Sequence, residues 1–219
     1  MRVQAVIFDL DGTLVDSNGL HVTAWKQAFI EAGHAISADA IAGQIGKGAD
    51  NLVPALIPGA DSAMAEALGD RHGAIFKARY LHGVQPFPNA RDLVARVHGS
   101  RGRVALASSA SEQELEHYLD LLELRALVEA TTTIEDVKRS KPAPDIFAAV
   151  LGKLPGVAAD AALVVGDTPY DVQAANDCGV ATVAVRSGGF DDGALAGAIA
   201  VYDDVAALLE RFEGSPLAI

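Results

Sequence analysis

The chain is poor in cysteine, in aromatic residues and in positive charge. Cys178 is the only cysteine among 219 residues, which excludes an internal disulfide and favours a reducing compartment. Only 5% of the residues are aromatic, and 17 basic residues stand against 29 acidic ones, giving a formal net charge of −12. No basic stripe stands out, so the sequence disfavours a nucleic-acid partner. A small phosphorylated substrate stays possible, because it needs only a local positive group and a metal.

The chain also lacks a long apolar run. No segment approaches the length of a membrane span, and Asp9 and Asp11 interrupt the only early apolar stretch. We therefore expect neither a signal peptide nor a membrane partner. Half of the residues are hydrophobic, which is enough to bury a full core. These features predict a globular, cytoplasmic protein that is a monomer or a homodimer.

Short apolar runs alternate with helical patterns along most of the sequence. This alternation predicts an α/β fold with a Rossmann-like parallel sheet and helices on both faces. In such sheets, ligands bind outside the carboxyl ends of the strands. The predicted strands are residues 3–8, 104–107, 162–165 and 181–185, with weaker candidates at 127–131 and 198–202.

Residues 17–85 break this rhythm, because helical patterns follow one another there without a convincing strand. A crossover between parallel strands needs only one helix, so this is too much chain. We predict a helical cap domain at 17–85, with hinges near 15–18 and 84–88, inserted into a core formed by 1–16 and 86–219. The alternative is extra helices packed flat on the sheet. The tail at 214–216 is expected to fray.

The most informative segment runs from Ile7 to Val15 and reads Ile-Phe-Asp-Leu-Asp-Gly-Thr-Leu-Val. The predicted strand stops at Asp9, and Asp11 follows beyond a single leucine. Two neighbouring carboxylates at the end of a buried strand are costly to hold as bare charges. They make physical sense if they share a divalent cation and an anionic substrate. The alternative is an ordinary turn, since Asp and Gly are common turn formers.

Three further segments place polar groups at the same edge of the predicted sheet. Ser108 follows the strand 104–107, Lys141 lies in a loop stiffened by two prolines, and Asp167 and Asp171 belong to a Gly-Asp-Thr-Pro-Tyr-Asp segment after the strand 162–165. Each alone has an ordinary reading as a turn residue, a solvated lysine or a helix N-terminal charge. Together with Asp9 and Asp11, in this order, they resemble the four motifs of the haloacid dehalogenase (HAD) superfamily. The likeness covers nearly the whole chain.

The resemblance implies an enzyme of the branch with a small helical cap, which includes phosphoglycolate phosphatases and β-phosphoglucomutases. Such a phosphatase would hydrolyse a small phosphomonoester, for example phosphoglycolate or a sugar phosphate. Asp9 would be the nucleophile that forms an aspartyl-phosphate, and Asp11 the general acid and base. The hydroxyl of Ser108 would bind a phosphate oxygen, and Lys141 would neutralise charge between nucleophile and phosphate.

The resemblance also implies a magnesium ion, which prefers oxygen ligands in octahedral geometry. Asp9, the backbone carbonyl of Asp11 and Asp167 would hold Mg²⁺. Asp171 would contact the metal through water or hold Lys141.

Substrate contacts are expected from both parts of the chain. Backbone amides near Leu10 and Ser109 would bind phosphate. His21 and Trp25 share a helix face and would line the mouth of the site, with ordinary packing as the alternative. Lys47 lies between two glycines in the loop 44–51, and we expect it to bind the non-reacting part of the substrate, with a solvated lysine as the alternative. The other histidines show no metal-ligand spacing and are interpreted as structural or surface residues.

Two other functions remain open. Phosphosugar mutases that resemble this chain carry an arginine in the cap loop for a second phosphate, and the loop 44–51 has none, although Lys47 would be a partial substitute. A non-enzymatic phospho-receiver domain also places paired Asp, a Ser or Thr and a Lys at strand ends. Receivers are shorter, lack a helical insertion and keep their phospho-acceptor in a later strand. Hydrolysis is therefore the favoured reading.

Overall fold

The computed structural model describes residues 3–218 and confirms a parallel sheet covered by helices. Every pairing in its main sheet is parallel, and β1 lies in the interior of the sheet between β4 and β6. The strands are β1 (Ala5–Phe8), β4 (Arg103–Ala107), β5 (Ala130–Thr132), β6 (Ala162–Gly166), β7 (Ala181–Val185) and β8 (Ala200–Tyr202). They lie in the order β5-β4-β1-β6-β7-β8.

The central strands are apolar throughout because both faces of the sheet are covered. In β1, Val6 and Phe8 point into one apolar cluster, and Ala5 and Ile7 point into another, since side chains alternate along a strand. Within residues 3–218, no helix has the length and the apolar character needed to cross a bilayer. The first face is covered by α5 (Ala90–Gly99), α6 (Glu112–Leu121) and α9 (Val205–Glu210), the second by α7 (Asp145–Gly152) and α8 (Pro169–Asp177).

The sheet brings three predicted site residues to one edge. Asp9, Ser108 and Asp167 directly follow β1, β4 and β6, which are neighbours in the sheet. After β5 the chain crosses from one half of the sheet to the other, so the crossover changes direction beside β1. The crevice outside such a switch point is the usual ligand site of an open parallel sheet.

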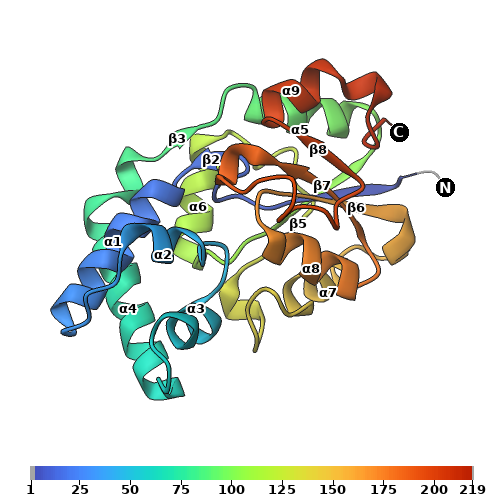
Figure 1. Ribbon diagram of the computed structural model, residues 1–219. Coiled ribbons are helices and arrows are strands. Elements are labelled where there is room, and N and C mark those ends of the chain that lie inside the picture. Colours follow the sequence, from blue (N-terminus) through green and yellow to red (C-terminus); the bar gives the residue numbers. More distant parts are fainter. Residues whose placement is uncertain (1–2, 219) are drawn as a thin grey trace.

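Four helices between β1 and β4 lie over this edge, and we call them the cap helices (Figure 1). They enclose an apolar cluster of their own, which includes Trp25, Phe29, Leu52 and Leu68. The division into a core of residues 1–16 and 86–219 and a cap domain of 17–85 stays a prediction. The cap helices are α1 (Asn18–Glu31), α2 (Ala38–Ala42), α3 (Ala49–Leu56) and α4 (Ser62–Arg79).

The two connections to the cap helices run side by side. The short strands β2 (Val15–Asp16) and β3 (Gln85–Pro86) pair antiparallel at the two predicted hinge segments. The sequence gives no sign of them, because a two-residue strand shows no periodicity. Their hydrogen bonding fixes where the cap helices leave and rejoin the core.

The expectation that the tail frays is wrong. Residues 212–214 form a single 3₁₀ turn, and the Ser215 hydroxyl donates to the Phe212 carbonyl at 2.8 Å. Leu217 is fully buried in the same apolar cluster as Phe212. Glycine and proline suggested a loose tail, but two apolar side chains bind it to the core.

Candidate active site

A buried lysine links two of the strand-end carboxylates. The ammonium group of Lys141 donates to Asp9 Oδ1 at 2.9 Å and to Asp171 Oδ1 at 2.7 Å, and the residue is only 1% exposed. Burial disfavours this charge, but Asp171 and Asp9 outweigh burial and raise the pKa of Lys141 above its usual value. Lys141 is therefore a fixed cation beside the carboxylate that the sequence analysis assigns as nucleophile.

The start of α8 orients Asp171. Thr168 is the N-cap of this helix, and its backbone N–H and hydroxyl donate to Asp171 Oδ2 at 3.1 and 2.6 Å. This capping box turns the other oxygen of Asp171 toward Lys141. One carboxylate thus both caps its own helix and fixes the lysine.

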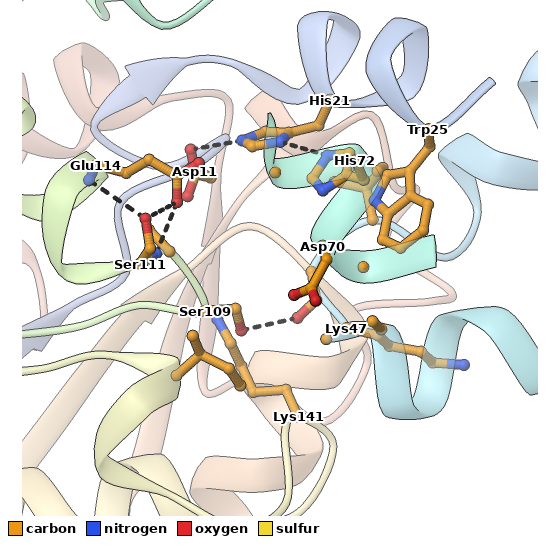
Figure 2. Close-up of a pocket in the computed structure, with 18 of the residues that line it drawn as sticks. Asp11, His21, Trp25, Lys47, Asp70, His72, Ser109, Ser111, Glu114 and Lys141 are labelled. Atoms are coloured by element: carbon orange, nitrogen blue, oxygen red, sulfur yellow. Dashed lines mark hydrogen bonds and ion pairs between the residues drawn. The ribbon is translucent and has the colours of Figure 1, made fainter. Parts of the chain in front are cut away.

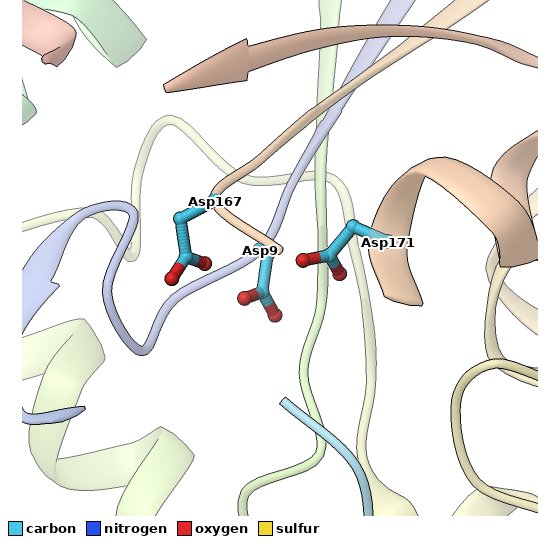
Figure 3. A group of neighbouring side chains, drawn as sticks. All are labelled: Asp9, Asp167 and Asp171. Atoms are coloured by element: carbon cyan, nitrogen blue, oxygen red, sulfur yellow. The ribbon is translucent and has the colours of Figure 1, made fainter. Parts of the chain in front are cut away.

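Three carboxylates could share a cation at this edge. Oxygens of Asp9, Asp167 and Asp171 lie within 4.8 Å of one another, and all three side chains are buried (Figure 3). Burial and neighbouring carboxylates raise the pKa of Asp9 well above its usual range and that of Asp167 to about 7. The single positive charge of Lys141 does not balance this group. An all-oxygen, electron-rich donor set of this kind fits a hard divalent cation such as Mg²⁺.

Glycine and two polar donors hold Asp167 in this group. The Thr13 hydroxyl and the Asn18 amide donate to its two oxygens at 2.9 and 3.0 Å. Gly12 has φ +76°, and a Cβ there would lie 2.1 Å from Asp167 Oδ2. Only glycine therefore allows the β1 loop to approach Asp167 so closely.

The Asp11 carboxylate lies apart from the three-carboxylate group and is held by hydroxyls and an imidazole. Its Oδ1 accepts from Ser17 Oγ at 2.6 Å, from Tyr118 OH at 3.0 Å and from His21 Nε2 at 3.2 Å. Burial raises the pKa of Asp11, but the charge of His21 and these hydrogen bonds outweigh it and lower the value to about 2. In this arrangement Asp11 is an ionised hydrogen-bond acceptor.

The remaining predicted phosphate contacts lie on the core side. Ser108 is fully buried, and its hydroxyl accepts from the Ala110 N–H at 3.0 Å and lies 3.5 Å from Asp11 Oδ2. Ser109 faces the pocket. The Leu10 side chain is buried in the core, so only its backbone remains for a ligand.

These groups open into a pocket of about 430 Å³ between the core and the cap helices (Figure 2). The predicted lining residues His21 and Trp25 both border it. Its core side includes Asp9, Asp11, Ser109 and Lys141, and its cap side includes Trp25, Lys47, Glu66, Asp70, His72 and Lys77.

His72, which the sequence indicates to be a structural or surface residue, is part of this wall. Its Nε2 lies 3.2 Å from Nδ1 of His21, and its ring stacks on Trp25 with centroids 4.3 Å apart. Burial, then the charge of His21, lower the pKa of His72 well below its usual value. A neutral His72 thus supports the imidazole that holds Asp11. Its place between the buried Leu68 and Phe76, at helical spacing, was the signal in the sequence.

Lys47 borders the pocket, but its ammonium group has other partners. It donates to the Gln44 side chain at 2.6 Å and lies 4.4 Å from the centre of the Tyr170 ring. In Figure 2 its side chain extends away from Lys141 and Ser109. Substrate binding by Lys47 stays a prediction.

Other residues of the site carried no sequence signal. Tyr118 lies on α6 among the buried residues of an apolar cluster. Ser17 immediately precedes α1 and reaches Asp11 across the first loop. Neither contact follows from local spacing, because each depends on how separate elements pack.

Comparison with known proteins agrees with this geometry. The sequence model described as haloacid dehalogenase-like hydrolase matches residues 6–185. A phosphoglycolate phosphatase from Rhodospirillum rubrum is 32% identical over 216 residues, covering 94% of this chain and 89% of that protein. A fructose-1-phosphate phosphatase from Escherichia coli is 28% identical over 186 residues, covering 84% and 97%. The crystal structure of a hydrolase from Pseudomonas syringae superposes with a TM-score of 0.88 at 32% identity, covering 96% and 98% of the two chains.

Proposed function

The chain belongs to the haloacid dehalogenase-like hydrolase family, and we propose that it hydrolyses a small phosphomonoester through an aspartyl-phosphate on Asp9. The observation that carries this proposal is the placement of Asp9. Its carboxylate ends a central strand, contacts the fixed cation Lys141 and borders a pocket of about 430 Å³. A pocket of this size accommodates a small metabolite.

In the first step, an Asp9 oxygen attacks phosphorus while the bond from phosphorus to the leaving oxygen breaks. Charge spreads over the three equatorial oxygens, and Lys141 stabilises it from a fixed position. In the second step, water attacks the aspartyl-phosphate, inorganic phosphate leaves and the Asp9 carboxylate is restored. Two easier displacements thus replace one difficult displacement.

Asp11 is the group that moves protons in both steps. It gives a proton to the leaving alkoxide and takes one from the attacking water, a general acid and base role. The donors Ser17, Tyr118 and His21 favour its ionised form, which suits the second step. We infer that some of these hydrogen bonds are released when Asp11 carries the proton for the first step.

We propose that Asp9 and Asp167, with Asp171 nearby, hold a magnesium ion. When bound, this ion supplies positive charge that offsets the negative charge of the phosphoryl group. The support is the excess of buried carboxylate over Lys141, together with the all-oxygen donor set. Lys141, Thr13 and Asn18 keep these carboxylates in place.

The charge of the cap wall bears on the leaving group. Glu66 and Asp70 border the pocket, and so do Lys47 and Lys77. The Lys47 ammonium donates to Gln44, whereas the Lys77 ammonium has no hydrogen-bond or ion-pair partner among residues 3–218. Figure 2 shows the Asp70 carboxylate directed into the pocket. Acidic side chains accept hydrogen bonds from hydroxyls and repel a second anion. This favours a hydroxylated substrate, such as a sugar phosphate, over phosphoglycolate.

The same wall argues against the mutase alternative. A phosphosugar mutase must bind a second phosphate at a distance from the nucleophile, and such a site needs a cluster of cations or amides. Incubation with a sugar 1-phosphate distinguishes the reactions: a hydrolase releases inorganic phosphate, whereas a mutase forms the isomeric sugar phosphate.

The decisive experiment measures phosphate release from an aryl phosphate with Mg²⁺ and with a chelator. Activity that needs Mg²⁺ and disappears in Asp9→Asn supports the proposal, and no release by the wild-type protein from any phosphomonoester contradicts it. Three substrates of equal length then test the leaving group: hydroxyethyl phosphate, phosphoethanolamine and phosphoglycolate. The hydroxyl compound should give the highest kcat/KM and the carboxylate the lowest.

A further inference from the structure

Ser140, the residue before Lys141, forms hydrogen bonds with the start of α3. We call residues 140–144, which carry Lys141, the catalytic loop. Ser140 is 1% exposed and lies opposite the first turn of α3. Its hydroxyl donates to Asp50 Oδ1 and accepts from the Gly48 N–H at 3.0 Å and from Asn51 Nδ2 at 2.9 Å. A hydroxyl has one donor and two acceptor positions, so all three are filled by α3 and its N-cap residue Gly48.

The backbone of the catalytic loop is held as well. The Ser140 N–H donates to Asp50 Oδ2 at 3.1 Å. The Asn51 amide also approaches the carbonyl oxygens of Ser140 at 3.3 Å and of Lys141 at 3.4 Å. The start of α3 therefore contacts the peptide groups on both sides of the lysine's Cα.

Glycine is what permits this approach. A Cβ at Gly48 would lie 2.6 Å from Ser140 Cβ and 2.8 Å from Asp50 Oδ1. Any side chain at position 48 would push the α3 start away from the loop. The neighbouring residues Gly46, Lys47 and Ala49 border the pocket, so the same segment faces the substrate and the lysine loop.

We propose that Asn51 and Asp50 are positioning residues, which act through Ser140 to place the Lys141 ammonium between Asp9 and Asp171. The inference rests on the proposed function for its kinetic consequence. Lys141 reaches the site on a long flexible side chain, and its Cα position decides whether Nζ meets both carboxylates. When the cap helices lie against the core, α3 fixes that Cα. Docking of the cap thereby completes the charge arrangement that stabilises the transferring phosphoryl group.

The test compares Asn51→Ala with Tyr170→Phe. Tyr170 OH donates to the Gly43 carbonyl at 2.5 Å, so its loss also removes a hydrogen bond between core and cap helices but leaves the Ser140 contacts intact. Steady-state hydrolysis of an aryl phosphate is expected to show kcat about 10- to 100-fold lower in Asn51→Ala, with little change in KM, because a misplaced catalytic group costs rate. Tyr170→Phe should stay within about 3-fold of wild type, as for a weak neutral hydrogen bond.

A second readout does not need activity. An amine-reactive reagent, followed by peptide mass spectrometry, measures how accessible Lys141 is, with the exposed Lys26 as internal reference. We expect faster labelling of Lys141 in Asn51→Ala than in the wild type or in Tyr170→Phe, at equal thermal stability. Unchanged labelling and kcat in Asn51→Ala would overturn the inference, as would equal losses in both variants, which would mean that the contacts only dock the cap helices. Lack of phosphatase activity in the wild type would overturn the proposed function, while the labelling still decides the positioning role.

Discussion

The charged residues on the two walls of the pocket differ in their burial and in their contacts. On the core side, Asp9, Lys141 and Asp171 are almost completely buried, and Lys141 donates to the two carboxylates at 2.9 and 2.7 Å. On the cap side, Glu66 and Asp70 of α4 are exposed where they border the pocket. Buried charges that bind one another are held in one geometry, which suits a reaction step. Exposed charges can be substituted at little cost to the fold, which suits selection among substrates. The comparison predicts large losses from core substitutions and small, selective changes from cap substitutions.

The largest effect is expected for Asp9→Asn. An amide is a poor nucleophile, so we expect kcat to fall by roughly 10⁴-fold or more, as when other covalent nucleophiles are removed. The fold should persist, because burial and the neighbouring carboxylates already disfavour the charge of Asp9. Phosphate release and thermal unfolding, measured on the same preparation, check both parts. More than a few per cent of wild-type activity in a folded variant would end the assignment.

Replacing a lysine on each wall should change the free energy of unfolding by very different amounts. Lys141→Ala leaves Asp9 and Asp171 buried without their cation, so the free energy of unfolding should fall by about 3–5 kcal/mol, as for other broken buried ion pairs. Lys77→Ala, on the cap side, is expected to change it by no more than about 0.5 kcal/mol. Denaturant unfolding of both variants without added metal gives the comparison. Equal losses would mean that the core charges are not coupled as described.

Asp11→Asn tests the proton-transfer step on the core side of the pocket. An amide cannot protonate a leaving alkoxide, and general acid–base groups contribute about 10²- to 10⁴-fold. The loss should be greater for alkyl phosphates than for activated aryl phosphates, whose leaving groups need no proton. Parallel kcat measurements on an alkyl and an aryl phosphate check this, and equal losses on both would argue against an acid role.

The difference between the walls also explains what the sequence could predict. Asp9, Ser108 and Asp167 were predictable because each follows an apolar strand, and parallel strands end at one edge. The strands of the main sheet and the cap helices were predictable from the pattern of apolar residues. The resemblance of the four motifs to those of the haloacid dehalogenase superfamily then suggested a role for each of these residues.

The partners of these residues were not predictable, because they come from packing between elements that are distant in sequence. Tyr118 reaches Asp11 across 107 positions, and Asn51 reaches Ser140 across 89. The stacking of His72 on Trp25 was not predictable either, because a histidine without metal-ligand spacing gives no local sign of it. The tail was misread for the same reason, since Leu217 finds its place only in the assembled core.

Asp70→Asn is expected to alter selectivity with little effect on the rate of the reaction itself. Removing one negative charge from an exposed wall should raise kcat/KM for phosphoglycolate about 3- to 10-fold, since exposed charge interactions are of the order of 1 kcal/mol. The kcat for an aryl phosphate should stay near wild type. A panel of hydroxyethyl phosphate and phosphoglycolate measures the ratio. No shift in that ratio would remove Asp70 from substrate selection.

The smallest effect is expected for Lys47→Ala, where the sequence favoured a substrate contact. The Lys47 ammonium already donates to Gln44 and lies over the Tyr170 ring, and burial lowers its pKa. To reach a substrate it would have to give up both partners, which offsets most of the gain from a new hydrogen bond. We therefore expect KM to change by less than about 3-fold for anionic and neutral phosphomonoesters alike. Gln44→Ala is the informative partner variant, because it frees the ammonium without removing it. If Gln44→Ala lowers KM for an anionic substrate and Lys47→Ala in the same background reverses the gain, Lys47 does reach the substrate, and the cap wall is less passive than its exposure suggests.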